Sequence, residues 1–265
     1  RIAEGCAHAT LNFDLIVIRN VLSYSHRQGF IRRCPDVKML MAKPPKHQRS
    51  RGAISKAQYK KTIALLKDQA DNATQRPNRL ALLRLRLAMM TIFSSAIRVQ
   101  EILKLEWRDI TLEQVNNNGM CTFITVRADV SKVKQHRVVP ALSGPQLWKS
   151  FQDFKEISPT SEPNELVFAS RKNTSIPAFI SMYYHHFVRK NGIPFKNELG
   201  QALSLTSLRH TAIDRLVNEH QLSAYIVAQY AGSSIKMIEE HYGKNQVRKQ
   251  AHLFISPSIV AKWDD

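Results

Sequence analysis

Residues 79–95 carry apolar side chains along so much of their length that they predict a central core helix, which would expose its three arginines, Arg79, Arg84 and Arg86. By contrast, residues 122–128 and 136–140 are rich in Thr, Phe, Ile and Val, which is typical of β-strands on either side of a turn. The sequence therefore predicts a mainly α fold with a small antiparallel β-sheet near residues 108–140, the α+β class. Further helices are predicted over 56–70, 143–156, 177–191, 207–219, 222–231 and 234–241, and a short strand or buried turn over 165–169.

The composition points to a nucleic-acid partner. The formal net charge is +18 and the isoelectric point is about 10.1, as expected of a protein that neutralises phosphates and releases their counterions. The charge alone would also fit an RNA-binding or ribosomal protein. A hydrophobic content of 43% indicates a real core and excludes a basic disordered tail. Because the sequence has no run of 18 apolar residues and no signal-peptide pattern, we expect a cytoplasmic protein without membrane association.

The residue pattern predicts no metal and no cofactor. Cys6, Cys34 and Cys121 lack the spacing of metal ligands or of a disulfide framework, so reduced thiols are expected. No cluster of carboxylates accompanies the four candidate site residues Arg98, Lys132, Arg209 and Tyr242, which disfavours a two-metal nuclease.

Two arginines lie where a guanidinium can be held in a cleft. Arg98 follows an apolar helix at a short turn and precedes a second predicted helix that buries Leu105. Arg209 is expected in the first turn of a helix capped by Thr206 or Ser207, where backbone N–H groups favour an anion. A guanidinium offers a planar fork of donors to two phosphate oxygens and keeps its charge near neutrality. The two segments are therefore candidates for a phosphate site, and the alternative that both arginines are solvated surface cations among the 39 lysines and arginines stays open.

Three motifs in order along the chain resemble those of the phage integrase family, the tyrosine recombinases. The first family motif places Glu, Leu, Trp, Asp and Ile at fixed intervals after its arginine, as the chain does between Arg98 and Ile110. The second reads His-x-Leu-Arg-His-Thr, and residues 206–211 match it except at the first position. In the third, the nucleophilic tyrosine stands nine residues after a histidine or tryptophan. Here Tyr242 stands nine residues after Ser233. The resemblance covers the whole catalytic domain of the family.

The resemblance implies metal-independent cleavage and rejoining of DNA through a 3′-phosphotyrosyl intermediate. Tyr242 would be the nucleophile, and Arg98 and Arg209 would stabilise charge on the non-bridging phosphate oxygens. Glu101 would support the arginine cleft.

A lysine in the predicted hairpin turn completes the implied set. The family pattern is Lys-x-x-Lys-x-Arg-x-Val-Pro, and aligning it on residues 137–140 makes Lys132 the proton donor to the leaving 5′-oxygen. Lys134 remains the alternative, and nonspecific contact of both lysines with the DNA backbone also stays open.

Two candidate site residues depart from the family pattern. Thr206 stands where a histidine is usual, and Ser233 where histidine or tryptophan is usual. Both hydroxyls can donate to a phosphate oxygen, but neither holds a proton near pH 7 as imidazole does. His210 is expected to be a structural helix residue, whereas for His241 a role at the site and a solvated or packed side chain stay equally open. What assists ionisation of Tyr242 is therefore unassigned.

The chain is expected to divide into three parts. Residues 1–42 resemble the last helices of the family's core-binding domain, whose beginning is expected to lie outside this sequence. Residues 43–52 read as a basic linker along DNA, and residues 53–265 as the catalytic domain. The apolar tail, residues 253–263, either docks on a neighbouring subunit or packs on its own core. The linker cations expected to contact DNA are Lys43, Lys46, Arg49 and Arg51.

The resemblance also implies partners. Double-stranded DNA is the expected partner, bound by a homotetramer on two sites, with a monomer as the alternative in the absence of DNA. The segment 237–243 resembles integrases of mobile elements more than housekeeping recombinases, which indicates a prokaryotic, DNA-associated protein. Two rivals stay open: a type IB topoisomerase-like enzyme, which would relax DNA without pairing two sites, and a catalytically weak or inactive DNA-binding relative.

Overall fold

The computed structural model describes residues 8–40, 52–116, 119–169 and 179–242. The chain divides into two compact units, Arg1–Ser50 and Arg51–Asp265. The first unit contains α1 (His8–Arg27). The side chain of Asn12 accepts a hydrogen bond from the backbone N–H of Leu40 (2.8 Å) and donates one to its carbonyl (3.0 Å), so the segment after the helix folds back onto it.

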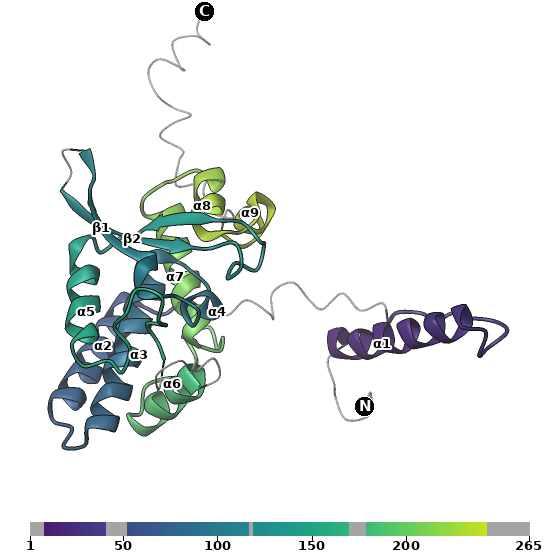
Figure 1. Ribbon diagram of the computed structural model, residues 1–265, viewed down its shortest axis with the longest axis horizontal. Helices are drawn as coiled ribbons and strands as arrows, with labels where there is room; N and C mark the ends of the chain where they lie inside the picture. The colour runs from purple at the N-terminus through teal and green to yellow at the C-terminus, as the bar shows by residue number, and fades with distance from the viewer. Residues whose placement is uncertain (1–7, 41–51, 117–118, 170–178, 243–265) are drawn as a thin grey trace, which may run out of the picture. The chain divides into compact units, whose positions relative to one another are not determined.

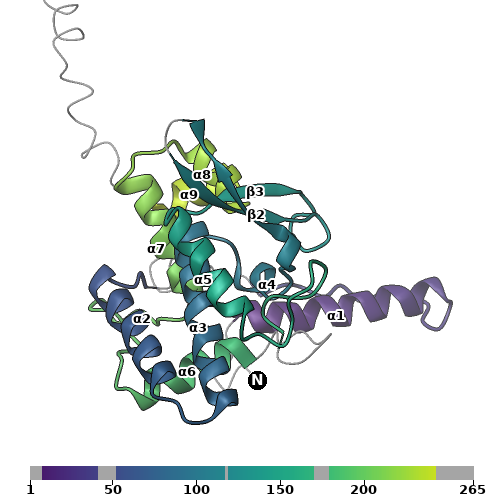
Figure 2. The same cartoon turned by 60° about the vertical axis from the view of Figure 1, so that its left-hand side comes forward.

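The second unit is built around α3 (Arg76–Ser95), whose Leu85, Met89 and Ile92 are almost completely buried. Three helices pack against α3, namely α2 (Lys56–Asp71), α5 (Pro145–Lys155) and α7 (Leu205–Asn218), and Figures 1 and 2 show α3 among them. Fewer contacts join α3 to α6 (Phe179–Lys190). The apolar helix predicted from the sequence is therefore the central element of this unit.

A three-stranded antiparallel sheet lies beside the helices. Its strands run in the order β1 (Ile110–Gln114), β2 (Met120–Val126) and β3 (Arg137–Pro140). Ile124 on the central strand lies opposite both Ile110 and Val139, and all three side chains are buried. Because a slip of one residue would turn these side chains to solvent, they fix the register. The mainly helical fold with a small antiparallel sheet is confirmed.

The last helices form a second core around α7. Ile213 of α7, Val227 of α8 (Ala224–Ala231) and Ile238 of α9 (Ile235–Tyr242) are buried together. The hydroxyl of Tyr230 on α8 donates to the carbonyls of Ser94 (2.8 Å) and Pro140 (2.9 Å). These contacts fix α8, and the turn that leads to α9, against the end of α3 and the edge of the sheet.

The helix expected after Arg98 is shorter than predicted. It is the single turn α4 (Val99–Ile102), followed by the 3₁₀ helix η1 (Trp107–Asp109). Leu105 is buried as expected, but its carbonyl accepts from Val167 (2.9 Å), and the N–H of Trp107 donates to Glu165 (3.1 Å). This pairing with the 165–169 segment, a buried turn, satisfies backbone groups that a longer helix would have used internally.

Two further expectations are corrected. α7 begins at Leu205 with Ser204 as its cap, whose N–H donates to Ser207 Oγ (3.0 Å), so Arg209 lies in the second turn and not the first. The side chain of Leu205 is buried in the core, so this residue belongs to the first turn of the helix. Arg84 is buried and not exposed. Helices pack around α3 on several sides, and not only against its apolar face. Within the described residues, no helix combines the length and apolar character needed to cross a membrane.

Candidate phosphate site

Arg98 lies at the junction between α3 and α4, as predicted. Ala96 ends α3 in the left-handed region (φ 51°), which turns the chain sharply before Arg98 becomes the N-cap of α4. The Arg98 guanidinium donates to Glu101 Oε1 (2.9 Å) and to the carbonyl of Gly232. Its backbone N–H donates to Glu101 Oε2 (2.9 Å). The side chain is thereby held between α4 and the α8–α9 turn, 134 residues away in sequence.

Glu101 holds two arginines with one carboxylate. Its side chain is 1% exposed and also accepts from both terminal nitrogens of Arg137 on β3 (2.6 and 3.3 Å). Burial acts to raise the pKa of the Glu101 carboxyl, but the hydrogen bonds from Arg137 and Arg98 outweigh it, so the pKa is lowered. Glu101 is therefore ionised at neutral pH and links the sheet to the Arg98 junction.

Arg209 lies beside Arg98 in a buried setting. It is 8% exposed, and its guanidinium donates to the carbonyl of Ala96, the residue that turns the chain toward Arg98. Burial, followed by repulsion from Arg98, lowers the pKa of Arg209 to about 10. The group stays charged at neutral pH but is destabilised by like charge and lost hydration, a condition that a bound anion would relieve.

Tyr242 ends α9 with its hydroxyl hydrogen-bonded to Nδ1 of His210. Burial raises the pKa of the phenol, and Arg209 acts in the opposite direction. The ring of His210, which was expected to be a structural helix residue, lies against Tyr242, since α7 and α9 pack side by side in the second core. His241 is exposed, with its ring centroid 6.4 Å from that of Tyr242.

A cleft of about 460 Å³ lies beside both arginines and beside Thr206, the residue that stands where the family pattern has a histidine. Arg98, Thr206 and Arg209 line it together with Gln100 and Leu205. Three further lining residues, Ser181, His185 and Ser204, come from α6 and the segment that enters α7. Sequence reasoning missed these polar side chains since none belongs to a motif and no periodicity indicates which face of α6 meets α7.

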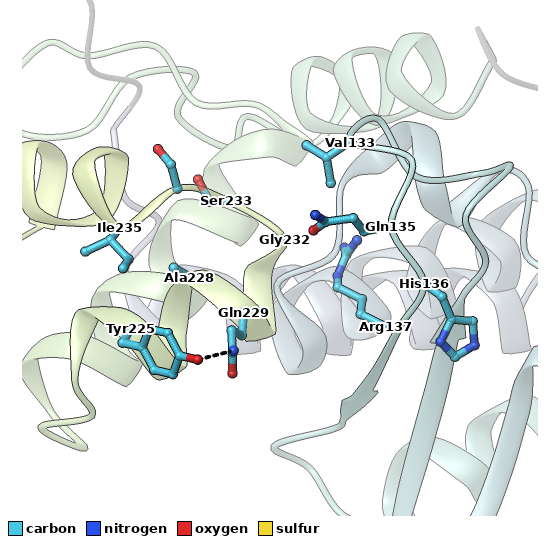
Figure 3. Close-up of a pocket in the computed structure, with 11 residues that line it drawn as sticks. Val133, Gln135, His136, Arg137, Tyr225, Ala228, Gln229, Gly232, Ser233 and Ile235 are labelled. Carbon is cyan, nitrogen blue, oxygen red and sulfur yellow. Dashed lines mark hydrogen bonds between the residues drawn. The ribbon is translucent and has the colours of Figure 1, made fainter.

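A second cleft, of about 670 Å³, lies between the β2–β3 turn and the end of α8 (Figure 3). Ser233 lines this cleft and not the one that contains Arg209. Gly232, at the C-terminus of α8, has φ 61°, and a Cβ there would lie 2.7 Å from the Arg137 guanidinium. Both the backbone conformation and the close approach of Arg137 therefore favour glycine at this position.

The two candidate lysines lie on the β2–β3 turn. Buried Val130 and Ser131 anchor the turn, and Lys132 and Lys134 project from it with exposed side chains. Val133 between them lines the second cleft. The linker cations Lys43, Lys46, Arg49 and Arg51, and the tail 253–263, lie outside the described residues. Within the described part of the chain, no three His, Cys, Asp or Glu side chains gather as metal ligands would.

Comparisons with known proteins identify a family and several structures of the same fold. The model of the phage integrase family matches residues 53–249. No curated protein matches the chain in sequence.

Solved structures share the fold at low identity. A XerH site-specific recombinase bound to a palindromic difH substrate, in a post-cleavage complex, has a TM-score of 0.61 and 17% identity over 99% of this chain and 69% of that chain. A lambda integrase dimer bound to a COC′ core site has a TM-score of 0.62 and 19% identity over 91% of this chain and 61% of that chain. The Tn1549 transposon integrase in complex with circular intermediate DNA has a TM-score of 0.56 and 15% identity over 91% of this chain and 76% of that chain.

The chain thus spans less than two thirds of the lambda integrase structure. The family match nevertheless covers most of the chain and contains Arg98, Arg209 and Tyr242. The chain therefore belongs to the phage integrase family, the tyrosine recombinases.

Proposed function

We propose that the chain cleaves and rejoins double-stranded DNA at specific sites, with Tyr242 as the nucleophile and no metal ion in the chemistry. One observation carries the proposal. Arg98 and Arg209, more than a hundred residues apart, line one cleft, and His210, the residue after Arg209, is hydrogen-bonded to the Tyr242 hydroxyl. Two charged forks beside a nucleophile suit a phosphodiester, whose transition state places negative charge on the non-bridging oxygens.

In the first step, Tyr242 Oη attacks the scissile phosphorus. His210 Nδ1, hydrogen-bonded to that hydroxyl, accepts its proton. The bond from phosphorus to the 5′-oxygen breaks, and Lys132 donates a proton to the departing oxygen, with Lys134 as the alternative donor. The product is a 3′-phosphotyrosyl DNA and a free 5′-hydroxyl.

In the second step, a 5′-hydroxyl of the partner strand attacks the phosphotyrosyl phosphorus, and Lys132, neutral after the first step, accepts the proton of that hydroxyl. The bond to Tyr242 Oη breaks, and the phenol recovers its proton from His210. Glu101 takes no proton in either step. Its part is to hold Arg98 in place through their two hydrogen bonds. Thr206, which lines the same cleft, donates a weaker hydrogen bond to the phosphate.

Exchange between two sites requires several copies of the chain, and we propose a homotetramer on two DNA sites. The net charge of +18 supports a DNA partner, since each neutralised phosphate releases counterions. The linker cations would lie along the DNA backbone, and the apolar tail would dock on a neighbouring subunit. The Tn1549 integrase among the similar structures supports action on a mobile element.

A denaturing gel tests the chemistry directly. The substrate is nicked DNA carrying candidate sites from the flanks of the source element, so that loss of the short leaving strand traps the intermediate. We expect a covalent protein–DNA adduct in the presence of chelator, and none with Tyr242→Phe. Binding without any adduct, even at a pH where the phenol ionises readily, would favour the inactive relative.

A further inference from the structure

His185 on α6 brings an imidazole to the cleft that contains Arg98, Thr206 and Arg209. Ser181, one helical turn earlier, lines the same cleft, which shows that this face of α6 is turned toward it. The side chain of His185 is exposed, so a ligand in the cleft can reach it. None of the motifs described above for Arg98, Lys132, Arg209 and Tyr242 includes this position.

The ring of His185 is held in place by the segment that leads into α7. Phe195 stacks on it, with ring centroids 6.0 Å apart and an interplanar angle of 21°. Phe195 belongs to a hairpin in which Leu203 N–H donates to its carbonyl (2.7 Å) and Lys196 pairs with Ala202. This hairpin ends at the cap of α7, next to Thr206. The same short segment therefore orients both His185 and the N-terminal turn of α7.

The adjacent histidine provides a natural contrast. His186 is also exposed on α6, but it lines a different cavity, together with Asp68 and Asn72 of the α2 region. The two imidazoles are adjacent in sequence, lie on the same helix and are both exposed. They differ in the cleft that they line. Any effect confined to His185 is therefore due to the arginine cleft and not to a general loss of surface charge.

The cleft already offers the guanidiniums of Arg98 and Arg209 to phosphate oxygens, and Thr206 supplies only a neutral hydroxyl where a histidine is usual. An imidazole N–H is a further donor and can carry positive charge near neutrality. We propose that His185 is a catalytic residue that donates a hydrogen bond to a non-bridging oxygen of the scissile phosphate, beside Thr206. This inference rests on the proposed DNA-cleavage function and names an additional residue of its phosphate site.

The first test uses inorganic phosphate and needs no DNA. The imidazole signals of the full chain are followed by NMR during a phosphate titration and assigned with His185→Asn and His186→Asn. We expect the His185 signal to move with phosphate, the His186 signal to stay, and the His185 shift to vanish in Arg209→Ala. A phosphate-dependent shift elsewhere in the cleft with an unmoved His185 signal would overturn the inference.

The second test separates chemistry from binding. In single-turnover adduct formation at saturating DNA, we expect His185→Ala to react about 10²-fold more slowly, as for loss of one donor to a developing charge. His185→Asn, which keeps an N–H donor, should recover part of the rate, and His186→Ala should match the unmodified chain. Weaker DNA binding with an unchanged rate would place His185 on the flanking backbone and refute the catalytic role.

The two tests distinguish the inference from the proposed function. If the unmodified chain forms no adduct while Arg209-dependent phosphate binding persists, the proposed function fails, and the NMR titration alone decides whether His185 faces the anion. If the adduct forms and disappears in Tyr242→Phe, the proposed function holds, and the rate of His185→Ala decides the inference.

Discussion

At the scale of single residues, Glu101 stabilises the site without taking part in proton transfer. One buried carboxylate satisfies the guanidiniums of Arg98 and Arg137, which belong to different elements. Removing its charge leaves two arginines close together without an anion. The cost of breaking such a buried pair is typically about 3–5 kcal/mol.

We therefore predict that Glu101→Gln lowers the free energy of unfolding at pH 7 by about 3–5 kcal/mol. Because the folded-state pKa of Glu101 is lowered, its contribution is present above the ordinary carboxyl pKa and is lost as the pH falls through the folded value. Urea unfolding at pH 7 and at lower pH should thus show a smaller acid dependence in the variant. Glu240→Gln, at an exposed carboxylate on α9, is the control. Equal losses in the two variants would contradict the prediction.

The hydrogen bond between His210 and the Tyr242 hydroxyl makes the activation of the phenol testable. Burial raises the pKa of Tyr242, so the hydroxyl needs an acceptor near neutrality. We predict that His210→Gln slows adduct formation by about 10²–10⁴-fold at pH 7.5 and that its rate rises more steeply with pH than that of the unmodified chain. Single-turnover rates over a pH series measure this. His241→Gln, at the exposed neighbouring imidazole, should change little; equal slowing in both variants would rule out a specific role for His210.

Several residues of the candidate site could be predicted from the sequence because they belong to short local motifs. Arg98, Arg209 and Tyr242 each belong to a short motif, and the junction at Arg98 follows from apolar periodicity. The contact between His210 and Tyr242 joins two helices and depends on how they pack. His185 lies in no motif, and its place in the cleft follows from the orientation of α6. Only tertiary structure gives such contacts.

At the scale of elements, the turn between α8 and α9 connects the site to the sheet. Gly232 accepts from Arg98 through its carbonyl and leaves room for Arg137. We predict that Gly232→Ala lowers the free energy of unfolding by about 1–2 kcal/mol, the cost of a left-handed non-glycine residue, and slows adduct formation because Arg137 and Arg98 must shift. Thermal unfolding and single-turnover rates measure the two effects.

Gly192→Ala is the matched control for this turn. Gly192 has almost the same φ (61°), but a Cβ there would meet no atom within 4 Å. It should lose similar stability and keep its rate of adduct formation. If Gly192→Ala slowed the reaction as much as Gly232→Ala, the effect on the rate would come from general destabilisation and not from the arginines.

The buried face of α3 offers a stabilising change. Nε and one terminal nitrogen of Arg84 are buried without a hydrogen-bond partner among the described residues, and burial lowers its pKa. A buried unsatisfied donor costs about 1–3 kcal/mol. We predict that Arg84→Met raises the thermal unfolding temperature, whereas Arg79→Met, at an exposed position of the same helix, leaves it nearly unchanged. A lower unfolding temperature for Arg84→Met would show that this guanidinium stabilises the fold.

Sequence patterns predicted helices well and their connections less well. The spacing of apolar residues placed α2, α3 and α5 to α9 within a few residues of their ends. β1 was not predicted as a separate strand. α4 was expected to be longer, because the 165–169 segment that pairs with the backbone after α4 lies far away in the sequence. The burial of Arg84 was missed for a similar reason: the number of helices around α3 is a property of the assembled unit.

At the scale of the whole molecule, the second unit begins with a few residues that pack and form hydrogen bonds within that unit. Ile54 is buried, and its N–H donates to Thr211 Oγ1 (2.9 Å) on α7. Gly52 donates to the carbonyl of Ala202 (3.3 Å) in the hairpin before α7. The segment just after the expected linker thus packs against the helix that carries Arg209.

This packing predicts where the chain can be shortened. A chain of residues 51–265 should unfold at the same temperature as the second unit of the full chain. A chain of residues 56–265 should lose about 2–4 kcal/mol, from the burial of Ile54 and its hydrogen bonds to Thr211. Thermal and urea unfolding of the three chains measure this, with Ile54→Ala in the full chain as a control for the buried side chain alone. If residues 51–265 unfolded well below the full chain, the two units would stabilise each other and would not be independent.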